Sequence, residues 1–408
     1  MLRKPLERLP PALIMLAALV WIAPPASAGP RYKPAIITGV SYNDLFNSYV
    51  TDLNDAGQYT LRQYYPPAAP PYTWHAALID GGGLADIHSL AGYMQSYARG
   101  LNSRGTVAGE AYVGAEYMSG PRDAYVRPYG GSMITMPQLG YGAGAFAVND
   151  SDSVAGYAFT DAEGNIPKAV VWSNEAGWIG RWLDLPDGKT ASRAFAINGP
   201  AGSPAHTLGS AWAGTDLTTS RYVVWNYDGT VNAILPADFY AVAINDSGRV
   251  LDYYGSTWSA GTVAATGLSQ ARSINNSGQV VGTLNGQGAI WQDGTITLLN
   301  SLLAGGSSVS IIDGYQINDR GVIIASGCEP GTTCGNEYHA YLLTPTWPIP
   351  GDANLDCTVN ILDLLFIRGR LNQNVGSGDN WQADATGDGR INILDLIAVR
   401  NKLNTACP

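Results

Sequence analysis

Two acidic stretches near the C-terminus have the residue types and spacing that bind a metal ion. Residues 352–363 read DANLDCTVNILD and residues 384–395 read DATGDGRINILD, so the second stretch repeats the first after 32 residues. Three carboxylates within one such stretch repel one another unless a cation lies between them. Calcium takes about six to eight oxygen ligands, and a loop of this length supplies them from positions 1, 3, 5, 7 and 12. The repeat therefore predicts two calcium sites.

The predicted ligands occupy the same positions in both loops. In the first loop they are Asp352, Asn354, Asp356, the carbonyl oxygen of Thr358, and Asp363. In the second loop they are Asp384, Thr386, Asp388, the carbonyl oxygen of Arg390, and Asp395.

A helix is expected to follow each loop. Apolar residues recur at helical spacing, and they are Leu364, Leu365, Ile367 and Leu371 in the first segment and Leu396, Ile397, Val399 and Leu403 in the second. We interpret both stripes as core. A module of fewer than about 60 residues buries little apolar surface, so bound calcium is expected to supply much of its stability.

The paired pattern resembles the type I dockerin domain over residues 351–408. Both copies have Asp rather than Glu at loop position 12, and Val-Asn or Ile-Asn at positions 8 and 9. One departure concerns position 6, where the usual glycine is present as Gly389 but replaced by Cys357. We therefore expect the first site to bind calcium more weakly. A generic EF-hand sensor is the alternative, but the helix that should precede each loop is missing.

The dockerin resemblance implies a protein partner, which is a cohesin domain. It places the contacts at loop positions 10 and 11 and farther along each helix, and here these residues are Ile361, Leu362, Arg368, Ile393, Leu394 and Arg400. Because the module is duplicated, the resemblance implies a near two-fold surface that docks in two orientations. An apolar pair in each copy suits the centre of an interface. The alternative is that these side chains pack within the module or against the rest of the chain.

Four cysteines predict two disulfides in an exported protein. Proximity in the sequence pairs Cys328 with Cys334 and Cys357 with Cys407. A cysteine-based metal site is the alternative, but these spacings match no zinc pattern.

A second repeat fills most of the chain before the acidic module. In each copy an apolar run precedes an asparagine, and a Val-rich run follows after a turn that contains Gly in most copies. Because Asn bonds to its own backbone and Gly adopts the left-handed conformation, each copy predicts a β-hairpin. The seven pivot asparagines are Asn54, Asn102, Asn149, Asn198, Asn245, Asn275 and Asn318.

Two further strands are expected in each repeat. The third recurs as segments such as Lys168–Trp172 and Arg221–Trp225, and the fourth as segments such as Trp182–Leu185 and Ile296–Leu299. Four short strands in a unit of about 45 residues are typical of a propeller blade. We therefore predict a mainly β protein, with a seven-bladed β-propeller over residues 29–343 followed by a small all-α calcium-loop domain.

The last repeat lacks a fourth strand. The segment Ala35–Val40 can supply it from the N-terminus and close the ring. A pair of β-sandwiches or an open array of repeats is the alternative. The repeats also resemble the HAF repeat of exported bacterial proteins, since His75-Ala76 and His339-Ala340 keep two of its three defining residues; this resemblance implies no particular chemistry.

The N-terminus has the pattern of a signal peptide over residues 1–28. Basic Arg3 and Lys4 precede a short apolar run, and Ala26-Ser27-Ala28 forms a small-residue cleavage site. An uncleaved membrane anchor is the alternative, although the run is short for a membrane span. We expect a secreted protein, extracellular or at the cell surface, with no membrane span after cleavage. Proline-rich residues 344–350 are expected to link the propeller to the module at 351–408.

Charge and motifs limit the function classes. The chain has 33 acidic against 23 basic residues, and its net charge of -10 makes nucleic acid an unfavourable partner. We find no hydrolase elbow, metalloprotease motif or phosphate loop, and we assign no catalytic residue. We therefore predict a secreted, non-catalytic binding protein that docks through calcium, with a polysaccharide or cell-surface ligand for its repeat domain. The alternative is a dockerin-bearing polysaccharide hydrolase or lyase with its active site on the propeller, since paired carboxylates meet in space rather than in sequence.

Overall fold

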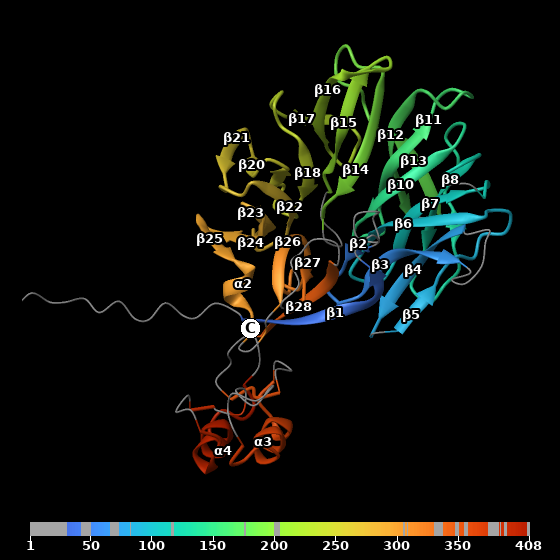
Figure 1. Ribbon diagram of the computed structural model, residues 1–408. Helices are drawn as coiled ribbons and strands as arrows, with labels where there is room; N and C mark the ends of the chain where they lie inside the picture. The colour runs from blue at the N-terminus through green and yellow to red at the C-terminus, as the bar shows by residue number, and fades with distance from the viewer. Residues whose placement is uncertain are drawn as a thin grey trace, which may run out of the picture.

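The computed structural model describes residues 31–41, 50–65, 73–81, 83–115, 118–174, 177–199, 205–304, 307, 309–329, 338–346, 351–354, 358–373, 383, 385–386 and 390–405. In this part of the chain, seven four-stranded antiparallel sheets stand around a common centre as the blades of a propeller (Figure 1). The predicted fold class is confirmed.

Six blades each use four strands that are consecutive in sequence. Blade 1 contains β2 (Val50–Leu53), β3 (Tyr59–Tyr65), β4 (Thr73–Asp80) and β5 (Gly83–Asp86); blade 2 contains β6 (Gln95–Leu101), β7 (Val107–Tyr112), β8 (Arg122–Arg127) and β9 (Ile134–Thr135); blade 3 contains β10 (Ala143–Val148), β11 (Val154–Phe159), β12 (Pro167–Asn174) and β13 (Trp178–Trp182). Blade 4 contains β14 (Ala191–Ile197), β15 (Thr207–Ala213), β16 (Asp216–Trp225) and β17 (Val231–Ile234); blade 5 contains β18 (Ala241–Ile244), β19 (Val250–Asp252), β20 (Ser256–Ser259) and β21 (Thr262–Ala265); blade 6 contains β22 (Gln270–Ile274), β23 (Val280–Leu284), β24 (Gln287–Gln292) and β25 (Thr295–Leu298), which the short helix α2 (Leu299–Leu302) follows.

The seventh blade joins the two ends of the propeller. It contains β26 (Ser310–Ile317), β27 (Ile323–Cys328) and β28 (His339–Thr346), and its outer strand is β1 (Arg31–Ser41). Ala35 lies opposite Leu342 and Lys33 opposite Thr344 in the antiparallel β1–β28 register. The N-terminal segment therefore closes the ring, as the missing strand of the last repeat predicts. The pairing also extends β28 into the first residues of the predicted linker.

The pivot asparagines build the inner hairpin of every blade. Asn149 shows the geometry: its Oδ1 accepts the N–H groups of Ser151 and Ser153, at 3.1 and 2.9 Å. Asp152 has a φ of 57° at the place where other copies have glycine, such as Gly105 with a φ of 81°. The register shifts in the inner hairpin of all seven blades. The repeated turn thus fixes the direction of the next strand.

The glycine that ends several repeats fits this irregular register. A Cβ on Gly109 would lie 2.0 Å from the carbonyl oxygen of Tyr97, and a Cβ on Gly156 would lie 2.0 Å from that of Gly144. No side chain fits at such a separation, so the Val-Ala-Gly run is required by the close approach of two strands.

The seven pivot asparagines also connect the blades. The side-chain Nδ2 of each donates to the backbone carbonyl oxygen of the next, at 2.7 to 3.0 Å, from Asn54 through Asn102, Asn149, Asn198, Asn245, Asn275 and Asn318 back to Asn54. All seven side chains are buried. We call this closed circuit the Asn ring.

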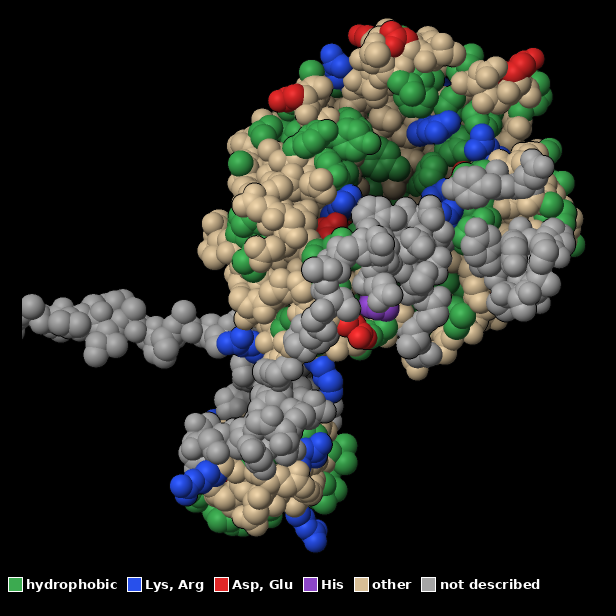
Figure 2. All heavy atoms as spheres, in the orientation of Figure 1, with side chains coloured by type: hydrophobic (Ala, Val, Ile, Leu, Met, Phe, Trp, Pro, Cys, Tyr) green, Lys and Arg blue, Asp and Glu red, His purple; other side chains and the backbone are tan. Residues whose placement is uncertain are grey.

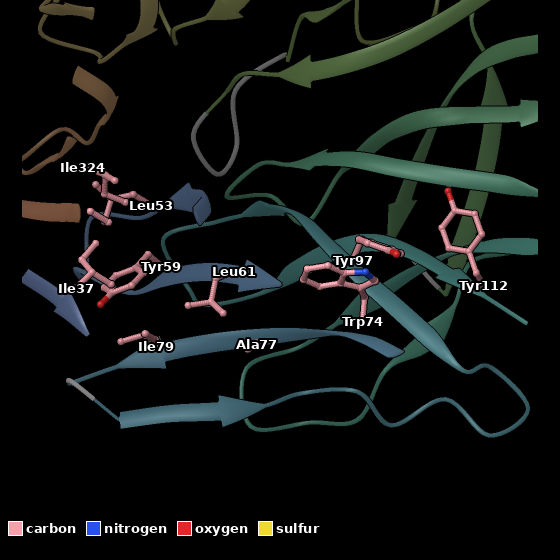
Figure 3. Packing of buried hydrophobic residues seen from close by; sticks show 11 residues of the cluster. Ile37, Leu53, Tyr59, Leu61, Trp74, Ala77, Ile79, Tyr97, Tyr112 and Ile324 are labelled. Carbon is pink, nitrogen blue, oxygen red and sulfur yellow. The ribbon is translucent and has the colours of Figure 1, made fainter. Parts of the chain in front are cut away.

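Apolar side chains fill the space between neighbouring blades. Figure 3 shows one such cluster, in which Ile37 of β1 and Ile324 of β27 lie beside Leu53 and Tyr59 of blade 1. Most of the other contacts use small or β-branched residues of the second and third strands, which are fully buried. The first and last blades are thus joined by packing as well as by the Asn ring.

The predicted position of one outer strand is wrong. In blade 3 the outer strand is Trp178–Trp182, whereas the sequence predicted Trp182–Leu185. The N–H of the buried Leu183 donates to the carbonyl oxygen of Ala169, and the N–H of Asp184 donates at 2.9 Å to the carbonyl oxygen of Gly229 in blade 4. The chain therefore leaves the outer strand at Trp182 and crosses to the next blade.

Two helices form a separate core after the propeller. They are α3 (Ile361–Arg368) and α4 (Ile393–Arg400), and Val359, Ile367, Ile391 and Val399 are buried between them. Among the described residues, no helix is both long and apolar enough to span a membrane.

Candidate functional site

The helices after the two predicted calcium loops begin in the same way. The side chain of Asn360 accepts the N–H of Leu362 at 2.7 Å, and Asp363 accepts the N–H of Asn360 at 2.8 Å. This capping box satisfies N–H groups that have no partner within the helix. The second helix repeats these bonds, at the same distances, with Asn392, Leu394 and Asp395.

The same two aspartates tie each loop to its helix. The second oxygen of Asp363 accepts the N–H of Asn354 at 3.0 Å. That of Asp395 accepts both the N–H and the hydroxyl of Thr386, each at 2.9 Å. Positions 3, 9 and 12 of each loop are therefore held together by one carboxylate.

Both aspartates are fully buried, and their remaining acceptor capacity fits a cation. A carboxylate has about four lone-pair positions. On Asp363 the two N–H groups occupy one position on each oxygen, so each oxygen keeps acceptor capacity for a cation. A buried carboxylate is costly without a compensating charge, and a donor set made of oxygen suits calcium.

Only some of the other predicted ligands belong to the described residues. Asp352 is buried, and Asn354, Thr358, Thr386 and Arg390 also belong to the described residues. Asp356, Asp384 and Asp388 lie outside them. Among the described residues no three acidic, His or Cys side chains gather in a metal-binding group, and half of the six predicted carboxylates are outside that set.

The predicted docking residues point into solvent. Ile361 and Leu362 are 62% and 52% exposed, and Ile393 and Leu394 are 61% and 53% exposed. Arg368 and Arg400 are exposed in the last turn of their helices. These apolar residues therefore do not pack within the module.

The predicted core stripe is wrong at one position in each helix. Leu365 and Ile397 are exposed, whereas Ile367 and Val399 are buried. Because a helix turns once in 3.6 residues, Leu365 lies on the same face as Ile361 and Leu362. Leu365 and Ile397 thus extend the exposed apolar surface on which the predicted docking residues lie, and their spacing from the Ile-Leu pair is the signal that could have identified them.

The cysteine predictions fall mostly outside the described residues. Cys328, buried in β27, is disulfide-bonded. Cys334, Cys357 and Cys407 lie outside the described residues, so both pairings stay predictions.

One constellation in blades 1 and 2 resembles a catalytic arrangement but has a structural role. His75 and His88 stack at 4.2 Å; His75 Nδ1 lies 2.8 Å from Asp86 Oδ2, and His88 Nδ1 lies 2.9 Å from Ser96 Oγ. Burial, with a smaller contribution from His75, lowers the pKa of His88. Ser96 is fully buried and accepts the N–H of Ala76 at 3.0 Å, so no substrate reaches its hydroxyl.

Several solved structures are similar to this chain, each at low sequence identity. The β-propeller domain of the Trilobed protease from Pyrococcus furiosus is 13% identical, with a TM-score of 0.43, and the match covers 72% of this chain and 97% of that one. A catalytically inactive virginiamycin B lyase from Staphylococcus aureus is 11% identical, with a TM-score of 0.39, over 76% and 99%. The PL25 ulvan lyase is 8% identical, with a TM-score of 0.38, over 78% and 94%. No curated protein matches the chain in sequence.

The C-terminal segment, in contrast, matches a defined family. The model of the dockerin type I domain matches residues 350–404, which include both acidic loops and both helices. The resemblance predicted from the loops is thereby confirmed, and the chain consists of a seven-bladed β-propeller followed by a dockerin type I domain.

Proposed function

We propose that this protein is exported, that its dockerin domain binds two calcium ions and a cohesin domain, and that its propeller is a non-catalytic binding body. The observation that carries the docking proposal is the pair of exposed apolar surfaces, one on each helix, made by Ile361, Leu362, Leu365 and by Ile393, Leu394, Ile397. Dockerin domains bind calcium and interact with cohesins.

The apolar surfaces have the composition of an interface centre. Large exposed apolar side chains lose water on docking, and this burial is the main favourable contribution to association. Arg368 and Arg400 stand at equal positions beside the two surfaces and supply polar contacts at the rim. A partner that fits one helix therefore fits the other after a half-turn of the module.

Calcium supports docking by shaping the helix starts. Asp363 and Asp395 belong to the predicted ion sites and also accept the N–H groups that hold the first turn of each helix. An ion on either carboxylate therefore fixes the segment that begins with Ile361 or Ile393.

The test uses the full chain and recombinant type I cohesin domains in a binding titration. Replacing Ile361 and Leu362 with Asp, or Ile393 and Leu394 with Asp, is expected to change affinity only a few-fold, because the other copy still docks. The variant with all four substitutions is expected to bind cohesin at least about 100-fold more weakly. Leu217→Asp, at an exposed apolar residue of β16, is the matched control.

Three results would count against these proposals. If no type I cohesin binds in the presence of calcium, a cohesin is not the partner. If either single-copy variant loses binding, the module does not dock in two orientations. If protein recovered from the medium has an intact mass that includes residues 1–28, these residues are not a cleaved signal peptide.

A further inference from the structure

One side of the propeller carries a connected group of arginines on aromatic rings. The guanidinium carbon of Arg99 lies 5.9 Å from the Tyr97 ring and 5.6 Å from the Phe146 ring. Arg193 lies 4.6 Å from Tyr157, and Arg272 lies 5.2 Å from Tyr253. Arg62 and Arg122 make the same kind of contact, with Tyr97 and Tyr157 respectively. We call Arg62, Arg99, Arg122, Arg193 and Arg272 the arginine cluster.

The members of this cluster come from five different strands and meet through shared neighbours. Tyr97 joins Arg62 to Arg99, and Tyr157 joins Arg122 to Arg193. Arg99 and Arg272 line one cavity together. Figure 2 shows Lys and Arg side chains around a hollow in the propeller, bordered by hydrophobic residues.

The local charge is opposite to that of the whole chain. Glu110 pairs with Arg99 at 3.0 Å and Asp313 with Arg272 at 3.1 Å. Asp252 is buried nearby, and its oxygens accept the N–H groups of Tyr240 and Tyr254. Glu110 and Asp313 each pair with one of the five arginines, so the paired carboxylates are fewer than the arginines in this part of the described chain, although the net charge of the protein is -10. Such a positive region attracts anions.

Part of the hydrogen-bonding capacity of the cluster is unused. The Nε atoms of Arg193 and Arg272 are buried and have no hydrogen-bond partner among the described residues. Arg193 also has no ion pair there and rests only on Tyr157 and Trp212. Buried donors without partners are uncommon in folded proteins, and guanidinium groups match the paired oxygens of carboxylates and sulfates.

The cavity beside the cluster suits a sugar. It has a volume of about 370 Å³, and its lining includes Arg99, Arg272, Tyr253, Tyr315 and Gln316. This volume falls in the range of small-molecule sites. Polar side chains, which fix the orientation of a ligand, and two tyrosines lie in the same lining.

Two exposed tyrosines contact a tyrosine of the cavity lining, Tyr253. Tyr240 and Tyr254 are 52% and 65% exposed, and both contact the ring of Tyr253, at 5.9 and 5.3 Å. A flat exposed ring packs against the C–H face of a pyranose while its hydroxyl stays in water. The tyrosines therefore favour a chain of sugars over a lone anion.

We propose that the arginine cluster and the neighbouring tyrosines form a binding site for an acidic polysaccharide, whose carboxylate or sulfate groups pair with the guanidinium groups. This inference rests on the proposed role of the propeller as a binding body and is independent of docking. Carboxylated and sulfated chains share the chemistry that the site recognises, so the experiment must separate them.

The experiment titrates the full chain, in calcium, with oligosaccharides of polygalacturonate, with the same oligosaccharides after carboxyl reduction, and with a sulfated dextran. Binding of one or both acidic probes is expected, with at least about tenfold weaker binding of the reduced chains. The acidic probe that binds more tightly identifies the anionic group. Equal affinity for acidic and reduced chains would overturn the proposal, as would tighter binding of single-stranded DNA.

Variants test the residues. Arg193→Gln is expected to weaken binding of the acidic probe about tenfold, and Tyr254→Ala several-fold, since Tyr254 is exposed and its loss leaves the fold intact. Arg181→Gln, which removes the same charge from exposed β13, is the matched control and should bind normally. Cohesin binding should stay unchanged in all three. If Arg193→Gln and Tyr254→Ala, both folded by circular dichroism, bind as tightly as Arg181→Gln, the site is not there.

Discussion

Asp363 and Asp395 each cap a helix, hold a loop together and are predicted to bind a cation. Each is fully buried, caps the start of a helix, and holds loop position 3 against position 9. Among the described residues, Asp395 accepts one bond that Asp363 does not, from the hydroxyl of Thr386, because position 3 of the first loop is Asn354. The negative charge favours a bound cation, and the carboxylate oxygens accept hydrogen bonds from backbone N–H groups.

Replacing Asp395 with Asn separates these purposes. The amide keeps one oxygen for the backbone but loses the charge, so the second loop should no longer bind its ion, while the first loop still does. Isothermal titration should show a calcium stoichiometry falling from two to one, with the domain destabilised by about 1–3 kcal/mol. Asp187→Asn, at an exposed turn of the propeller, is the control. An unchanged stoichiometry would contradict the assignment of Asp395 as a ligand.

At the scale of the element, the inner hairpin is the unit that the sequence specifies best. Each pivot asparagine uses its oxygen within its own turn and its nitrogen on the next turn, as Asn149 does with Ser153 and Asn198. Local turn geometry and blade order thus depend on one side chain. The circuit closes across the chain ends, where Asn318 donates to Asn54 at 2.9 Å.

Asn149→Asp tests the contribution of the Asn ring. Aspartate keeps the bonds to Ser151 and Ser153 but cannot donate to Asn198, and it leaves a buried carbonyl without its donor. We expect a loss of about 1–3 kcal/mol in the free energy of unfolding of the propeller, or a decrease of roughly 2–10 °C in its Tm. Asn165→Asp, at an exposed turn, should have no effect. If Asn149→Asp has the Tm of the wild-type protein, the Asn ring does not contribute to the stability of the propeller, and packing between the blades is sufficient.

These elements also show what the sequence could and could not predict. The seven hairpins follow from residues adjacent in the chain, because Asn and Gly act within four or five residues of themselves. The closing strand follows from the repeat, since the last copy lacks a fourth strand and β1 pairs with β28. The outer strand of blade 3 was misplaced because Leu183 is apolar for a different reason: it packs where the chain crosses between blades. Leu365 and Ile397 were assigned to the core because an apolar residue on a helix is equally compatible with a core and with a docking surface.

The arginine cluster could not be predicted as a group. Arg99 and Arg272 occupy the same position of the repeat, three residues before a pivot asparagine, but the other members lie on β3, β8 and β14 at positions that neither the repeat nor any motif marks. Only the closed ring brings Arg99 and Arg272 to one cavity. The predicted calcium loops are the opposite case, since all of the expected ligands of each loop lie within twelve residues and their spacing alone predicts them.

At the scale of the whole molecule, the chain has two bodies with different sources of stability. The propeller contains many buried clusters between its blades, whereas the dockerin domain has a single small core around Val359, Ile367, Ile391 and Val399. That core sits beside buried carboxylates, which repel one another until ions bind. Stability of the smaller body should therefore depend on calcium, and that of the propeller should not.

Calcium removal tests this division. In calcium, calorimetry of the full chain should show two transitions, and a chelator should lower or abolish the smaller one while the other stays within about 1 °C. Saturating calcium at 100 to 1,000 times its Kd contributes about 3–4 kcal/mol per site, which is most of the stability of a domain this small. Returning calcium should restore the transition, and magnesium should restore it poorly, because it prefers fewer and closer ligands. An unchanged trace with chelator would contradict ion-dependent folding of the dockerin domain, and a shift of both transitions together would show that the two bodies unfold as one.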